Sequence, residues 1–223
     1  MNCEFCDELN PIADTRFRAI YAGLLDSRIA LKDADYVAFP TIGQLFEGSY
    51  LVVPTVHVEK FAQLSPDLRS NALRFVSRIE SELRIASPTL VYEHGATSSI
   101  GGGCGIYHAH LHVVPLPEAT SLEILLPGVL GTQPRTILEG WNQVEGASEY
   151  LLVQDTRGKV LVARQNAAGE PFGSQYMRRR LVELFQLQAP WDWRDYTLPE
   201  AKLLRTAQIL PPSRASHGMD NRH

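Results

Sequence analysis

The sequence predicts an α+β fold followed by a small C-terminal α/β extension. Short β-branched or apolar runs bounded by polar residues recur in the first half of the 223-residue chain. One long segment, residues 65–87, carries apolar residues at three- and four-residue spacing. Beyond residue 148, two apolar runs flank a turn and precede two amphipathic segments. A period of two indicates strands and a period near 3.6 indicates helices, so both element types are expected.

Three runs near the N-terminus have the composition of strands. They are residues 17–22 (FRAIYA), residues 35–39 (DYVAF) and residues 49–54 (SYLVVP), the last closed by Pro54. Each is short, apolar and bounded by polar residues, as strands usually are. All three are predicted to be strands.

A helix follows the third predicted strand. Ser65 supplies an N-cap, Pro66 suits the first helical position, and Pro88 ends the segment. The apolar face repeats at helical spacing through Leu68, Ala72, Phe75, Val76, Ile79 and Leu83. Residues 89–95 (TLVYEHG) are the next strand candidate, and a glycine-rich loop, residues 96–105, leads to a histidine-rich strand.

The chain after residue 118 is expected to be an extension with its own elements. Residues 119–147 are rich in Pro and Gly and resemble a linker. Residues 149–165 are two apolar runs around Gly158, which indicates a hairpin. Residues 174–187 and 198–210 are predicted helices. The predicted organisation is therefore a domain at 1–118, an extension at 119–210 and a disordered tail at 211–223.

Composition excludes several classes of protein. Hydrophobic residues make up 44% and charged residues 21% of the chain, and the net charge is −4. Such a balance lacks the basic footprint of a nucleic-acid binder. The N-terminus has no signal-peptide pattern and no apolar run approaches the roughly 20 residues of a membrane span, so a cytoplasmic protein without a membrane partner is predicted. Cys3 and Cys6 are spaced for metal or redox chemistry.

Three histidines alternate with apolar residues in the segment YHAHLHVVP, residues 107–115. On a strand, His108, His110 and His112 would project from one face. This face has three interpretations: a solvated polar surface, part of a zinc site, or a nucleophile for phosphorus. A neutral ring whose Nδ1–H is held by a carbonyl presents a free Nε2 lone pair. Glycines at 101, 102, 103 and 105 favour phosphorus, because successive backbone N–H groups can form an anion nest.

The motif HAHLHVV resembles the signature of the histidine triad (HIT) family, and EGSYLVVPTVHVEKF, with His57, resembles the segment before that family's main helix. The resemblance covers about residues 1–118. It implies a HIT-like antiparallel sheet with packed helices and a nucleotide hydrolase or nucleotidyltransferase. Its substrate would be a dinucleoside polyphosphate, a nucleoside phosphoramidate or a related compound, and phosphorolysis is the same chemistry with another acceptor.

The same resemblance assigns roles within the motif. The middle histidine, His110, would attack the α-phosphorus and carry the covalent nucleotidyl group. His112 would hold a phosphate oxygen, and His108 completes the candidate catalytic triad. The loop of Gly103, Cys104 and Gly105 would contact the phosphates.

Some bacterial family members carry an N-terminal Cys-x-x-Cys that binds zinc. Carried over by position, the ligands would be Cys3, Cys6, His57 and His108, a closed Cys₂His₂ set that suits a structural zinc. The alternative is two reduced surface cysteines.

Three positions depart from the family pattern. Thr41 stands where a ribose-binding carboxylate is common, and Cys104-Gly105 replaces Gln-Ser/Thr. These departures motivate a second hypothesis, a catalytically inactive, zinc-stabilised nucleotide-binding or scaffold protein. His112 stands where the galactose-1-phosphate uridylyltransferase branch has glutamine. His94 is either a packed core residue or an extra active-site contact.

The extension raises two further alternatives. One interpretation of the arginine run is a solvated helix face formed by Arg178, Arg179 and Arg180. The other is that Arg179, together with Gln175, closes over a substrate phosphate or sugar. Compact family members are dimers. The chain is therefore expected to be a homodimer, or a pseudo-dimeric monomer whose extension occupies the place of a second subunit's C-terminus.

Overall fold

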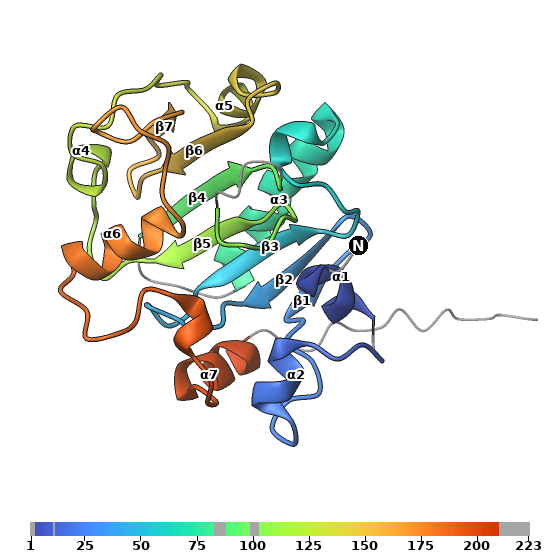
Figure 1. Cartoon of the computed structure of the whole chain (residues 1–223). Coiled ribbons are helices and arrows are strands. Elements are labelled where there is room, and N and C mark those ends of the chain that lie inside the picture. Colours follow the sequence, from blue (N-terminus) through green and yellow to red (C-terminus); the bar gives the residue numbers. More distant parts are fainter. Residues whose placement is uncertain (1–2, 11, 83–87, 99–102, 210–223) are drawn as a thin grey trace, which may run out of the picture.

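A seven-stranded antiparallel sheet organises the chain (Figure 1). The structure is a computed structural model, and it describes residues 3–10, 12–82, 88–98 and 103–209. The strand order is β1-β2-β3-β5-β4-β6-β7. The strands are β1 (Leu31–Lys32), β2 (Tyr36–Pro40), β3 (Tyr50–Pro54), β4 (Thr89–Ala96), β5 (Leu111–Pro115), β6 (Glu149–Gln154) and β7 (Val160–Ala163).

Helices cover both faces of this sheet. They are α1 (Glu4–Leu9), α2 (Arg16–Tyr21), α3 (Pro66–Glu82), α4 (Leu122–Leu125), α5 (Ile137–Gln143), α6 (Tyr176–Leu184) and α7 (Ala201–Ile209), with single 3₁₀ turns η1 (Phe61–Gln63) and η2 (Trp193–Asp195). The predicted α+β class, an antiparallel sheet with packed helices, is confirmed. No helix within the described residues is long and apolar enough to cross a membrane.

The two faces of the sheet have different cores. One face packs against α3 and α5, with Phe75 and Trp141 among its largest buried side chains. The other face packs against α4 and α6 at the β6–β7 end, around Leu151 and Leu181. At the β2–β3 end the same face is covered by Phe5 of α1. The functional side chains described below lie on this second face, between α1 and α6.

The C-terminal hairpin extends the sheet. Strand β6 pairs with β4 from Val91↔Gln154 to Ala96↔Glu149, and β7 pairs with β6. The extension therefore shares the sheet of the N-terminal region and brings α6 and η2 onto its second face.

The prediction of a strand at residues 17–22 is wrong, because residues 17–21 belong to the helix α2. Thr15 caps the helix by accepting a hydrogen bond from the Arg18 N–H. Phe17 and Tyr21 are both buried at i, i+4 spacing, which is a helical period. The apolar composition of the segment concealed that period.

The histidine strand begins later than predicted. Strand β5 starts at Leu111, so His108 and His110 precede it. Pro54 ends β3, and a proline has no N–H to continue the ladder. The Ala109 N–H instead donates to the Val58 carbonyl, 2.6 Å away.

Other predicted elements are found close to their expected positions. Strands β2, β3 and β4, helix α3, the β6–β7 hairpin and helices α6 and α7 all lie within their predicted segments or extend at most one residue beyond them. The linker-like stretch 119–147 contains α4 and α5, the latter capped by Thr136. The predicted tail 211–223, residues 83–87 and the glycines at 101 and 102 lie outside the described residues.

Candidate functional site

Two cysteines and two histidines meet beside the N-terminal helix. Cys3 precedes α1 and Cys6 lies within it, while His57 follows β3 and His108 precedes β5. Their ligand atoms all lie within 4.8 Å of one another. Cys3 Sγ is 3.3 Å from His108 Nδ1, and Cys6 Sγ is 3.4 Å from His57 Nδ1. A group this close can hold a metal ion.

The orientation of His108 fits this cluster. Its Nε2 lies 2.9 Å from the Pro54 carbonyl oxygen and donates to it, so Nδ1 faces the two sulfurs as an acceptor. Such an outer hydrogen bond is the usual way in which a protein fixes the tautomer of a metal-binding histidine. Burial lowers the pKa of His108 to about 4, which keeps the ring in the neutral form that binds metals.

His110 is held in the orientation expected of a nucleophile. Its Nδ1–H donates to the His108 carbonyl, 2.7 Å away, which leaves Nε2 as the other ring nitrogen. The edge of Phe5 packs against the ring at 5.4 Å between centroids. The centroids of the His110 and His112 rings are 5.1 Å apart. His110 and His112 therefore point into the same space, whereas His108 is turned toward the cysteines.

The Cys104 Sγ lies 3.4 Å from the His110 Nε2. Burial alone would raise the pKa of this thiol, but the adjacent His110 ring outweighs burial and the net direction is downward. Burial would likewise lower the pKa of His110, and the Cys104 sulfur outweighs it, so that pKa is raised. Each group therefore favours the charged form of the other.

His112 has a different electrostatic environment. It stacks on Tyr92 at 4.3 Å between centroids, with the two rings almost parallel. Burial, followed by the charges of His110 and Arg178, holds the pKa of His112 well below its ordinary value. The ring is therefore neutral near pH 7 and can donate one N–H.

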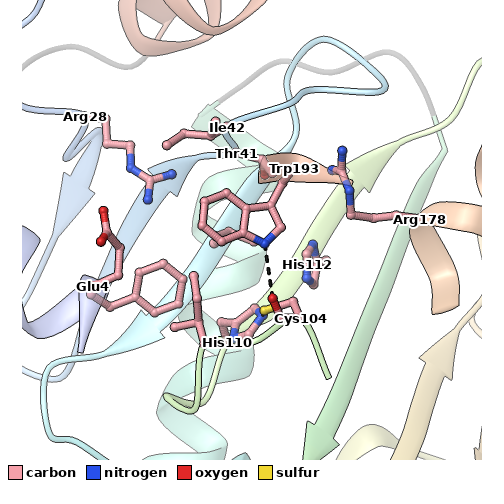
Figure 2. A pocket seen from close by; sticks show the side chains of 12 residues that line it. Glu4, Arg28, Thr41, Ile42, Cys104, His110, His112, Arg178 and Trp193 are labelled. Atoms are coloured by element: carbon pink, nitrogen blue, oxygen red, sulfur yellow. Dashed lines mark hydrogen bonds between the residues drawn. The ribbon is translucent and has the colours of Figure 1, made fainter. Parts of the chain in front are cut away.

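The His110 and His112 rings line a cavity together with Thr41, Arg178 and Trp193. Figure 2 shows Glu4 and Arg28 on one side of the Trp193 indole, and His112 and Arg178 on the other. The Trp193 Nε1–H donates to the Cys104 carbonyl at 3.2 Å. The C-terminal segment thus covers the histidines and is anchored to the loop that precedes them.

Of the predicted phosphate-binding residues, Thr41 and Cys104 line this cavity, and Gly103 and Gly105 flank Cys104 in the chain. Gly103 and Gly105 have φ angles of 69° and 84°, in the left-handed region that favours glycine. Thr41 lines the cavity, and its hydroxyl is buried without a hydrogen-bond partner among the described residues. A polar ligand would satisfy this hydroxyl.

The arginines of α6 have three different environments. Arg178 is 5% exposed, lines the histidine cavity and donates to the Gly43 carbonyl, so its assignment to a solvated face is wrong. Arg179 lines a separate outer cavity and lies over Trp191, 5.4 Å from the ring centroid. Arg180 donates to the carbonyls of Leu125 and Ile124. Gln175 lies beside the histidines, away from the outer cavity.

Sequence reasoning missed several lining residues. Arg178 lies three positions before the buried Leu181, and this i, i+3 spacing indicated the buried side of the helix. Glu4 and Phe5 lie between the predicted metal ligands Cys3 and Cys6, which indicated their location. Trp193 carried no signal, because its position depends on the path of the chain after α6.

Comparison with known proteins adds a family match. Residues 23–119 match the model of the HIT domain. The chain is 25% identical over 114 residues to Protein hit of Bacillus subtilis, covering 51% of this chain and 70% of that one. It is 27% identical over 93 residues to an uncharacterized HIT-like protein of Borreliella burgdorferi, covering 41% of this chain and 67% of that protein. A solved HIT family hydrolase from Clostridium thermocellum has a TM-score of 0.42 at 15% identity, covering 54% and 96% of the two chains.

Proposed function

The chain carries a HIT domain over residues 23–119, and on that premise we propose that it is a nucleotide hydrolase or nucleotidyltransferase that forms a covalent intermediate on His110. The observation that carries the proposal is the 2.7 Å hydrogen bond from His110 Nδ1 to the His108 carbonyl. It fixes the tautomer in which Nε2 holds the lone pair when the ring is neutral. That nitrogen belongs to a ring that lines the cavity shared with His112, Thr41 and Arg178.

The reaction has two steps. In the first, His110 Nε2 attacks the α-phosphorus, and the bond from phosphorus to the leaving group breaks. In the second, water or another acceptor attacks the phosphorus, and the P–N bond breaks with its electron pair returning to Nε2. Before the first step, the proton between Cys104 Sγ and His110 Nε2 must lie on the sulfur, and the contact between these two atoms must open to free the Nε2 lone pair.

Positive charge and N–H donors near His110 suit the developing phosphoryl charge. Backbone N–H groups at Gly103 and Gly105 and the neutral His112 ring are available to the non-bridging oxygens. Arg178 adds a fixed positive charge to the same cavity. The unsatisfied Thr41 hydroxyl supports a role in binding the sugar or phosphate of a nucleotide.

We also propose zinc as the metal of the cluster formed by Cys3, Cys6, His57 and His108. Tetrahedral zinc with ordinary Zn–S and Zn–N bonds separates sulfur and nitrogen ligands by roughly 3.5 Å. The observed separations are 3.3, 3.4 and 3.5 Å. With four protein ligands, such a zinc would stabilise the N-terminus and have no part in the reaction.

Turnover of a fluorogenic AMP phosphoramidate and of a dinucleoside polyphosphate tests the enzymatic proposal. We expect the wild type to cleave at least one of them and to form a nucleotidyl adduct detectable by mass spectrometry. Replacing the nucleophile, His110→Asn, should lower turnover by at least about a thousandfold while nucleotide binding changes little. Tight binding with neither product nor adduct would instead support the inactive binding protein.

A further inference from the structure

A histidine outside the triad is paired with a carboxylate beside the same cavity. His94 on β4 has its Nε2 2.8 Å from the Glu149 Oε1 on β6. Both side chains are only 8% exposed. The pairing of β4 with β6 brings these two residues together, and so the pair depends on the C-terminal hairpin. A buried carboxylate that accepts a hydrogen bond from a histidine Nε2–H fixes the orientation of the ring and leaves Nδ1 as its other nitrogen.

The other nitrogen of His94 is not satisfied by the protein. Its Nδ1 is buried and has no hydrogen-bond partner within the described part of the chain. The ring lines a small cavity together with Cys104, His110 and His112, and Phe172 packs on it edge to face at 5.8 Å. A histidine that serves only as packing is expected to have both nitrogens hydrogen-bonded. Here one nitrogen is held by Glu149, and the other is available to a group in the cavity of the nucleophile.

We propose that His94 is a general acid–base residue of this site, an inference that rests on the proposed covalent mechanism. In the first step, the protonated ring gives its Nδ1 proton to the leaving oxygen as the P–O bond breaks and the bond from His110 Nε2 to phosphorus forms. In the second, the neutral Nδ1 takes a proton from the water that attacks phosphorus. The P–N bond breaks and its electron pair returns to His110, while His94 keeps the proton taken from the water and is in its starting state again.

This assignment gives Glu149 a defined part. Glu149 is a positioning residue, because it acts through the His94 ring and does not line the cavity of the triad. The assignment also fits the composition of the loop, since Gly105 has no side chain that can exchange a proton with a leaving group. A histidine base or acid close to the reacting atoms typically contributes 10²–10⁴-fold to the rate.

The experiment uses the full-length chain and two esters of AMP that differ in the leaving group. The p-nitrophenyl ester releases p-nitrophenolate, which needs no proton, whereas the methyl ester releases an alkoxide that does. For His94→Ala with the p-nitrophenyl ester, we expect a burst of about one equivalent at a rate within about threefold of the wild type. Steady-state turnover should fall by about 100-fold, because the water in the second step has lost its base. With the methyl ester, the rate of the first step in His94→Ala should already fall by about 100-fold. Added imidazole should raise the turnover of this variant at least tenfold.

Glu149→Gln is the matched variant, and it keeps the experiment decisive if His94→Ala folds poorly. An amide still holds the ring without the carboxylate charge, so a smaller loss of steady-state turnover, about tenfold, is expected with the burst retained. The His94 proposal is overturned if both variants turn over both esters within threefold of the wild type. It is equally overturned if burst and steady state fall together and imidazole restores neither. A wild type that gives no burst and no adduct would instead remove the covalent mechanism itself.

Discussion

Glu93 and His94 are consecutive residues of β4 whose side chains lie on opposite faces of the sheet. Glu93 is buried among Phe61, Trp141 and Tyr150 on the face covered by α3 and α5. His94 lies on the other face, where it lines a cavity with the triad. Because side chains alternate along a strand, two ionisable neighbours have unrelated roles. The first stabilises the core, and the second is available for chemistry.

Replacing Glu93 with alanine should strongly destabilise the fold. Its carboxylate accepts hydrogen bonds from the Phe61 N–H at 2.8 Å, the Trp141 Nε1–H at 2.8 Å and the Tyr150 hydroxyl at 2.7 Å. Truncation leaves three buried donors without an acceptor, and each unsatisfied group costs about 1–3 kcal/mol. We expect the free energy of unfolding, measured by urea denaturation, to fall by about 3 kcal/mol or more.

Glu183→Ala is the control for this measurement, because the Glu183 side chain is 69% exposed. Its effect should stay within about 0.5 kcal/mol. A Glu93→Ala protein that unfolds within 1 kcal/mol of the wild type would show that the three donors find other partners.

His112 should make the stability of the protein depend on pH. Its pKa in the folded state lies well below the ordinary value of 6.5, chiefly because of burial. Below about pH 6.5 the unfolded chain therefore binds a proton that the folded chain does not. Stability is lost as the pH falls, by about 1.4 kcal/mol per pH unit for one such proton.

The variant His112→Gln removes this proton and keeps a polar side chain. Between pH 6.5 and 5, its free energy of unfolding should decline less steeply than that of the wild type, by up to about 1.4 kcal/mol per pH unit. His108, whose folded pKa is also low, is present in both proteins and contributes equally to both slopes. Two superimposable pH profiles would contradict the interpretation of His112 as a buried neutral ring.

The N-terminal half of the site could be predicted from the sequence because its signals are local. The alternating histidines and the Cys-x-x-Cys spacing each lie within a few residues, and the family resemblance that they carry implied Cys3, Cys6, His57 and His108 as one group, which the structure brings together. Strand periodicity likewise located β2, β3 and β4. The failure at residues 17–22 has a local cause as well, since a six-residue apolar helix and a strand have similar composition.

The rest of the site depends on pairing between distant segments, which a single sequence does not encode locally. Glu149 reaches His94 only because β6 pairs with β4 in a particular register. Gly95 shows the same dependence: a Cβ there would lie 2.5 Å from Cζ of the Tyr150 ring, so the glycine permits the Tyr150–Glu93 contact. Trp193 is held over the cavity by a hydrogen bond to the carbonyl of Cys104, which lies 89 positions earlier in the chain.

A metal bound by Cys3, Cys6, His57 and His108 should hold α1 in place and, through α1, one wall of the cavity. Helix α1 has six residues and no side-chain N-cap hydrogen bond, so it is too short to be stable by itself. Its Phe5 packs against both His108 and His110. Protein purified without chelator is expected to contain about one equivalent of zinc. Cys6→Ser should lower that content below about a tenth of an equivalent and lower the Tm by about 10 °C, because several kcal/mol of binding energy are lost.

The third cysteine provides the control for metal binding. Cys104 lies beside His110 and outside the cluster, so Cys104→Ser should keep the full zinc content. Hydrogen exchange then reports on the connection between the two sites: in Cys6→Ser the amides of residues 4–9 should lose protection, whereas those of β6 should keep it. Equal zinc contents in the wild type, Cys6→Ser and Cys104→Ser would disprove the assignment of the ligands. Loss of zinc with residues 4–9 still protected would show that α1 is held by Phe5 and the surrounding core alone.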